Sequence, residues 1–251
     1  MGSRGRRRAR KRKGGVAHCV LAPSPAFAIL DAQHAENRNV RYGGQNAKQQ
    51  KCAQCEQSPD KHTIKWIESS RTTDKLMERL IDGLEKVDLK GIELGKTPEK
   101  SEIMAGALAG TIEGGKTLQY VALSGPNGAL LKKVASLGKD VTFVLGDLGL
   151  TGGKSIDVRG NLFAPKSAGK LPNKLGNCAA QKVLHAFFGD AKKAEKKVQK
   201  IEMTEMFWRS FTHTGEKNQK WSTIEAVESC DTCKQVVPQM LCDKVDVAMR
   251  S

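Results

Sequence analysis

Two cysteine-bearing stretches in the last third of the chain constrain its fold most strongly. The first begins at Cys178, which follows Gly176 and Asn177, residues typical of loops and helix caps, and precedes apolar residues at helical spacing. The second is a Cys-x-x-Cys pair, Cys230 and Cys233, which is also followed by apolar residues at helical spacing. Two helix starts that carry three thiols indicate that distant segments meet at one metal ion.

Three cysteine thiolates are suited to zinc, which binds sulfur ligands in tetrahedral geometry. Four protein ligands close a structural zinc site, whereas three leave one position open for water, as in catalytic sites. Bound zinc makes hydroxide available near neutral pH. The sequence therefore predicts a Zn²⁺ ion held by Cys178, Cys230 and Cys233, with one open position.

These two stretches resemble the zinc signature of the cytidine-deaminase-like superfamily. In that family a His or Cys, with a Glu two residues later, lies on one helix, a Cys-x-x-Cys lies on the next, and the Glu transfers protons. The resemblance assigns Cys178, Cys230 and Cys233 as zinc ligands, and it is closest to bacterial toxin-type deaminases and their eukaryotic relatives. It implies a three-layer α/β fold, with a central mixed sheet of about four to five strands flanked by helices.

The sequence departs from this signature in three places. Ala180 stands where the resemblance places the catalytic Glu, and a methyl group cannot transfer protons. Ser229 stands where a Pro usually precedes the Cys-x-x-Cys, and the gap between the two halves is long, about fifty residues. We interpret Ala180 as an engineered replacement of Glu that leaves zinc binding without turnover. A natural pseudoenzyme and three unrelated buried cysteines are the alternatives.

The activity that the resemblance implies is hydrolytic deamination, in which zinc hydroxide attacks C4 of a cytosine and ammonia leaves. Asn177 and Ser229 are expected to shape the pocket. Asn161, near the end of an expected strand, is a candidate contact for the sugar or base, with a turn role as the alternative. Trp221 borders a polar, basic stretch and is a candidate for stacking on a flanking nucleotide, with buried packing as the alternative.

The charge of the chain favours a nucleic-acid substrate. The net charge is +15, and eight positive charges lie within residues 4–13 without an acidic residue among them. Residues 1–15 cannot bury an apolar core, and we expect a disordered tail that binds phosphates or directs nuclear import, or that is merely solvated. Single- or double-stranded DNA is the favoured partner and RNA the alternative. Two other functions stay open: a non-catalytic zinc-containing nucleic-acid-binding protein, and a deaminase of free cytidine or nucleotides.

The cysteine content indicates a reducing compartment. An odd total of seven cysteines with Cys-x-x-Cys spacing favours metal ligation over a disulfide framework. No stretch reaches the ~18 apolar residues of a membrane helix, and no secretory signal follows the basic start. We expect an intracellular protein that does not bind membranes, nuclear if the tail is an import signal, or delivered into a target cell if it is a toxin. The sequence does not indicate the oligomeric state.

Two further motifs imitate known sites. A His-x-Glu at residues 34–36, together with Cys52 and Cys55, copies the deaminase signature, but the fifteen intervening residues are too few for the helix and strand required. A small structural zinc site of Cys52, Cys55 and His62, with Cys19 or the histidine of the tripeptide, is one alternative, and free thiols are the other. Residues 110–117 match the P-loop pattern, but a helix before them and a strand after them would reverse the P-loop order.

Hydrophobic periodicity divides the chain into a basic tail (1–15), a loosely structured extension with a Cys-x-x-Cys (16–70) and a deaminase-like domain (71–251). In the resembled fold a helix and a strand hairpin precede the first zinc helix, and the expected order agrees. Helices are expected at residues 71–95, 98–110 and 129–137, and strands at 118–123, 140–149, 155–164, 201–211 and 244–249.

Overall fold

A computed structural model describes most of the second half of the chain and short parts of the first. Side chains are not described at residues 68, 102, 207–211 and 220–225. The expectations for the basic tail, Cys19, the tripeptide at 34–36, His62, Ser229 and the strand at 244–249 concern residues outside the described set. That set comprises residues 51–57, 67–87, 102–134, 137–146, 148, 153–167, 170–171, 173–211, 220–225 and 230–242.

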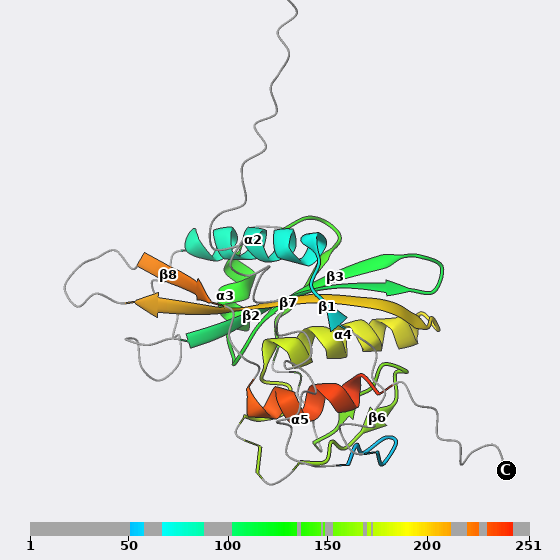
Figure 1. The fold of residues 1–251 in the computed structure, drawn as a ribbon. Coiled ribbons are helices and arrows are strands. Elements are labelled where there is room, and N and C mark those ends of the chain that lie inside the picture. The colour runs from blue at the N-terminus through cyan, green and yellow to red at the C-terminus, as the bar shows by residue number, and fades with distance from the viewer. Residues whose placement is uncertain are drawn as a thin grey trace, which may run out of the picture.

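A mixed six-stranded sheet forms the centre of the fold (Figure 1). Its strands follow the order β1-β7-β2-β3-β4, and β8 also pairs with β7. The β1–β7 and β3–β4 pairs are parallel, and the others are antiparallel. The α/β class expected from the sequence is therefore present. The strands are β1 (Ile67–Glu68), β2 (Glu102–Ile112), β3 (Thr117–Leu123), β4 (Val141–Val144), β7 (Val198–Phe211) and β8 (Lys220–Glu225).

Helices cover both faces of this sheet (Figure 1). On one face α2 (Arg71–Glu85) and α3 (Gly128–Lys133) share an apolar core with the sheet. On the other, α4 (Ala179–Lys193) lies against β2 and β3, and α5 (Asp231–Met240) packs against α4. None of the described helices is both long enough and apolar enough to cross a membrane.

Helix α2 forms because its leucines recur at helical spacing and its first turn is capped. Leu76, Leu80 and Leu84 are buried against the sheet. Ser70 is the N-cap, and its hydroxyl accepts from the backbone N–H of Thr73 while the Thr73 hydroxyl accepts from that of Ser70. The helix ends at Glu85, ten residues before the expected end, and β1 precedes it, so the folded unit includes residues before the expected boundary at 71.

Residues 98–110 were expected to form a helix, and this expectation is wrong, because residues 102–112 form the buried strand β2. Ile103 and Ala105 belong to the core shared with α2, whereas Leu108 and Ile112 belong to the core shared with α4. Both faces of β2 are therefore buried, so its sequence shows no apolar–polar alternation that would identify a strand.

Two glycines of β2 allow α4 to approach the sheet closely. A Cβ on Gly106 would lie 3.2 Å from Cβ of Ala179, at the start of α4. A Cβ on Gly110 would overlap the ring of Phe187, two turns further along the same helix. The small residues that suggested a helix in the sequence thus form the surface of β2 on which α4 packs.

The P-loop pattern at residues 110–117 forms the turn of an antiparallel hairpin. Strand β2 enters the turn and β3 leaves it, with Thr111 paired to Thr117. Gly114 and Gly115 have φ of 91° and 79°, which only glycine adopts readily. No helix follows the turn, so it lacks the helix N-terminus of a phosphate-binding loop. A strand, and not the expected helix, precedes the motif.

The region expected as one strand at residues 155–164 is a small separate hairpin. Its strands β5 (Ser155–Ile156) and β6 (Leu162–Phe163) pair only over these residues. The buried carboxylate of Asp157 accepts from the backbone N–H groups of Arg159 and Asn161 and from the Arg159 guanidinium, and so closes the turn between them. The hairpin is joined to the end of α5, because the N–H of Val158 donates to the carbonyl of Met240 (2.7 Å).

Candidate metal centres

Cys178 and Cys230, fifty-two residues apart, meet at the N-termini of two helices. Cys178 is the N-cap of α4 and Cys230 is the N-cap of α5, and their sulfur atoms lie 3.3 Å apart. Cys233, in the first turn of α5, completes a group whose three sulfurs all lie within 4.8 Å of one another. Tetrahedral coordination with metal–sulfur bonds of about 2.3 Å separates two sulfurs by roughly 3.8 Å. The predicted triad is therefore assembled with a spacing that suits a metal ion.

The start of α4 is held in place by the loop that follows β3. The carbonyl of Asn177 accepts from the N–H of Gly125 (2.8 Å). One turn into α4, the buried ammonium of Lys182 donates to the carbonyls of Leu123 (2.9 Å) and Gly125 (2.6 Å). Cys178 is thus positioned from both sides, by the backbone hydrogen bond of Asn177 before it and by the hydrogen bonds of the Lys182 ammonium one turn after it.

The three thiols share their negative charge unequally. Hydrogen bonding to Cys178 and Cys233 holds the pKa of Cys230 well below its ordinary value. The same hydrogen bond to Cys230 raises the pKa of Cys178, and hydrogen bonds to Cys178 and Cys230, together with complete burial, raise that of Cys233. A single thiolate at Cys230 is therefore the stable charge state without a metal, and the positive end of the α5 dipole favours it.

Two polar residues near the triad were not identified from the sequence. Gln181 is buried, accepts from the N–H of Gly176 (2.8 Å) and donates to the sulfur of Cys233 (3.5 Å). Glu205, on β7, is also buried, and its charge contributes to the raised pKa values of Cys178 and Cys233. Gln181 lies three residues after a ligand, a spacing that places it on the ligand's side of the helix; no local signal marks Glu205.

Ala180 lies in the first turn of α4, two residues after Cys178, and is fully buried. The position assigned to the missing carboxylate is thus next to the triad, within the core beneath α4. Asn177 immediately precedes Cys178 and is half-buried. Both residues therefore lie within two positions of a candidate ligand.

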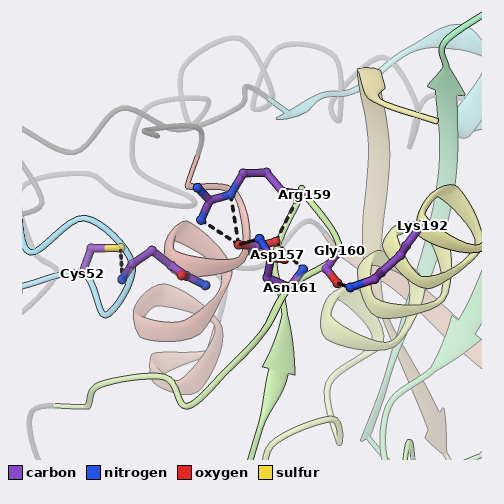
Figure 2. Close-up of polar contacts among 7 residues, drawn as sticks. Cys52, Asp157, Arg159, Gly160, Asn161 and Lys192 are labelled. Atoms are coloured by element: carbon purple, nitrogen blue, oxygen red, sulfur yellow. Dashed lines mark hydrogen bonds and ion pairs between the residues drawn. The ribbon is translucent and has the colours of Figure 1, made fainter. Parts of the chain in front are cut away.

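Asn161 and Trp221 lie elsewhere in the fold. The backbone N–H of Asn161 donates to Asp157 (2.8 Å) in the turn between β5 and β6, as Figure 2 shows. This is the turn role that was the alternative to a substrate contact. Trp221 is the second residue of strand β8, where it is paired with Ser210 of β7. Ser210 lies five residues beyond Glu205 on β7, roughly 17 Å along the strand.

A second sulfur triad joins two distant segments. Cys52, Cys55 and Cys242 lie with their sulfurs all within 4.8 Å of one another, and all three are buried. Cys52 and Cys55 were expected as candidate ligands with His62, whereas Cys242 was not among the expected ligands and is the partner that the fold supplies. The two triads lie near opposite ends of α5.

Comparison of the chain with protein-family models, with curated proteins and with solved structures gave no match. The chemistry of the site is therefore inferred from the geometry of its residues. Three convergent thiols at two helix N-termini can bind a soft or borderline divalent cation, which replaces the two bound protons. One coordination position is then left for water or another ligand.

Proposed function

We propose that the chain is a deaminase-like zinc protein in which Cys178, Cys230 and Cys233 bind zinc and Ala180 replaces the proton-transferring Glu. The observation that carries the proposal is the meeting of a lone Cys and a Cys-x-x-Cys at the starts of two adjacent helices. In the resembled family the same constellation binds the zinc ion that activates water. With zinc bound, the site would bind a hydroxide but would lack the group that transfers its proton.

The order of elements supports the same proposal. Helix α2 and the antiparallel β2–β3 hairpin precede the first cysteine helix, α4, with α3 and β4–β6 between them. The hairpin expected from the strands at 140–149 and 155–164 does not form in the described residues, because β4 pairs with β3 and β5 pairs with β6. Strand β7 then lies between the two cysteine helices in sequence, with α5 after it. Because α4 and α5 pack against each other on one face of the sheet, their N-terminal cysteines can share one ion.

The substrate class that we propose is cytosine in nucleic acid, with DNA favoured. The net charge of +15 supports it, because lysine and arginine neutralise phosphates and release counterions. Zinc deaminases act on bases that are single-stranded or flipped out of the duplex, so an exposed base must reach the open zinc position. A zinc protein that binds nucleic acid without chemistry uses the same cysteines and charge and differs only in needing no carboxylate.

Restoring the carboxylate tests the proposal. Ala180→Glu and its uncharged isostere Ala180→Gln are compared with the unaltered chain on single- and double-stranded DNA, RNA and free cytidine, with zinc content measured for each protein. We expect zinc in all three proteins and uracil formation only with Ala180→Glu, by at least the 10²–10⁴-fold that acid–base catalysis typically contributes.

The Gln variant serves as the matched control, because it fills the same buried space without an exchangeable carboxyl proton. Zinc in every protein with no product on any substrate would favour the non-catalytic nucleic-acid-binding protein. Product from Ala180→Gln or from the unaltered chain would show that residue 180 is not the proton-transfer position. Absence of metal from the unaltered chain would remove the basis of the proposal.

A further inference from the structure

We propose that Cys52, Cys55 and Cys242 supply three of the four ligands of a zinc ion that fastens the segment 51–57 to the end of α5. The three sulfurs come from a Cys-x-x-Cys and from a residue 187 positions after it, and they converge to within 4.8 Å of one another. Exposed fractions of 3%, 8% and 0% show that water does not solvate them. A disulfide would use two of these sulfurs, whereas a zinc ion uses all three.

The segment 51–57 forms a turn that directs the sulfur atoms of Cys52 and Cys55 toward the same place. The N–H of Glu56 donates to the carbonyl of Cys52 (3.0 Å), and the N–H of Cys52 donates to the carbonyl of Gln57 (2.9 Å). The N–H of Gln54 donates to the sulfur of Cys52 (3.3 Å), an arrangement that stabilises negative charge on that sulfur (Figure 2). Glu56 adopts the left-handed region with φ of 56°, so the chain reverses directly after Cys55.

A single side chain of α5 receives this turn. Gln239 is buried, and its carbonyl oxygen accepts from the N–H of Ala53 (3.0 Å) and of Lys166 (3.1 Å). Its amide nitrogen donates to the carbonyls of Lys166 and Gln235 (2.7 Å each). Gln239 therefore aligns the turn beside Cys242, which lies three residues further along the chain, before any metal is considered.

The segment also makes weaker contacts with the rest of the fold. The three cysteines form a buried cluster of their own, and Ala53 is the residue of the segment that packs against the core of α4 and α5. The ion pair of Glu56 with Lys166 is exposed and 3.8 Å long, so it contributes little. Ordering a polar segment costs conformational entropy. A metal ion bound by three thiolates would offset the cost of ordering residues 51–57.

The second site is independent of the first. Cys233 and Cys242 are nine residues apart, roughly 14 Å along the helix direction, and the two triads share no residue. Loss of one metal is therefore expected to leave the other in place. Because the sulfur atoms of Cys52 and Cys55 already lie close to that of Cys242, zinc binding needs no rearrangement of the fold.

The test measures zinc per chain, by elemental analysis, in the full chain and in Cys242→Ser, Cys52→Ser/Cys55→Ser and Cys230→Ser. We expect two zinc ions in the full chain and one in each variant, with Cys242→Ser/Cys230→Ser holding none. Trypsin cleavage after the exposed Lys51 supplies a second readout. It is expected to be several-fold faster in Cys242→Ser than in the full chain, and unchanged in Cys230→Ser, the matched control at the other end of the same helix.

Three results would overturn the proposal. The first is that Cys242→Ser retains as much zinc as the full chain. The second is a mass lower by two hydrogens, from a disulfide between two of these cysteines, in a full chain that holds one zinc. The third is that iron takes the place of zinc. If Cys242→Ser does not fold, Co²⁺ titration of Cys178→Ser/Cys230→Ser replaces it: thiolate absorption that saturates at one equivalent supports the second site, and absence of thiolate absorption overturns it.

Discussion

Lys182 is a charged residue buried in the core beside the first triad, with 1% of its surface exposed. A buried ammonium is tolerated only where hydrogen bonds replace its water. Two carbonyls of the segment after β3 provide them, and the same segment contacts Asn177 next to Cys178. One side chain thus connects the position of a candidate ligand to the end of a strand.

Replacing Lys182 with Met is expected to lower the free energy of unfolding by about 2–3 kcal/mol, because two buried carbonyls lose a charged donor. The measurement is urea unfolding at fixed zinc concentration. Lys193→Met is the control on the same helix, since the Lys193 side chain is 80% exposed and pairs with Asp190 at the surface. That change should cost less than about 0.5 kcal/mol. Equal effects of the two substitutions would contradict an anchoring role for Lys182.

Residue-level patterns in the sequence identified the first triad but not the contacts around it. Cys178, Cys230 and Cys233 could be predicted because each occurs at a helix start followed by a clear apolar stripe. Gln181 and Glu205 could not, because a buried polar side chain looks like a surface one until its partners are known. Asn161 was ambiguous for the same reason, and its bond to Asp157 shows the turn role.

The packing of α4 on β2 depends on the absence of side chains at two positions of the strand. Phe187 occupies the space above Gly110, and its ring also contacts Tyr120 at 6.1 Å between centroids. Burial and a hydrogen bond to Asp190 raise the pKa of Tyr120, so its hydroxyl stays protonated and donates to that carboxylate. The helix cannot move outward without breaking this contact.

Gly110→Ala is therefore expected to destabilise the fold by about 1–3 kcal/mol, because the added methyl overlaps the Phe187 ring. Thermal unfolding of the zinc-loaded protein measures it. Combining the change with Phe187→Leu should recover part of the loss. Gly189→Ala, where nothing lies within 4 Å of the added methyl, should stabilise α4 by about 0.5–1 kcal/mol. If Gly110→Ala were neutral, the close approach of α4 would be wrong.

The two helix N-termini make metal binding at the first triad dependent on pH. Cys178 and Cys233 have raised pKa values and remain protonated near pH 7, whereas Cys230, with its lowered pKa, is already ionised. A metal that binds three thiolates must then release two protons. Affinity is expected to rise by about 100-fold per pH unit across the neutral range, and to fall equally as pH decreases.

This pH dependence is measured in Cys52→Ser/Cys55→Ser/Cys242→Ser, which isolates the first triad. Titration with Zn²⁺ in weak buffer should release two protons per ion, and competition with a chelator at pH 6.5, 7.0 and 7.5 should give the slope. Adding Cys178→Ser should reduce the release to one proton. Release of three protons would mean that Cys230 is not ionised in the metal-free protein.

The elements most accurately predicted were those with strong periodicity. Helix α4 and helix α5 have one apolar stripe each, and β3 and β7 follow a run of apolar residues bounded by turn residues. Strand β2 was mistaken for a helix because alanine and glycine replaced the branched residues of a typical strand. Small residues are needed in β2 because α4 packs closely against it, and local propensity does not encode such a tertiary contact.

At the scale of the whole molecule, about half of the net positive charge lies at the start of the chain. Eight positive charges lie within residues 4–13, while the candidate zinc site lies in the second half of the sequence. Under the proposed function, the tail contributes affinity for phosphates without contributing to chemistry or to metal binding.

Deleting residues 1–15 should lower the affinity for single-stranded DNA by a similar factor for every sequence tested. The slope of log K against log salt concentration should become shallower, by up to about 0.7 for each lost phosphate contact. Fluorescence anisotropy at several salt concentrations measures both effects. Zinc content should not change, which serves as the control for folding. An unchanged slope would assign nucleic-acid binding to the folded part, or favour a free-nucleotide substrate.

The second triad could not be predicted as a set, because Cys242 lies 187 positions after Cys55 and no pattern links them. Cysteine spacing identified the pair at 52 and 55, and the third member becomes apparent only when α5 brings it there. Long-range contacts of this kind depend on the whole topology of the sheet, which sequence periodicity does not specify.

The position of Cys242 has a consequence for biosynthesis. Ribosomes make the Cys52–Cys55 turn early, and its third sulfur emerges only after every strand of the described sheet has been synthesised. Until then the two early thiols have no partner in α5 and are exposed to oxidation or to metal exchange. The zinc-bound turn can therefore form only in a chain translated at least as far as residue 242. Chains that stop earlier would leave the segment 51–57 undocked and accessible to protease.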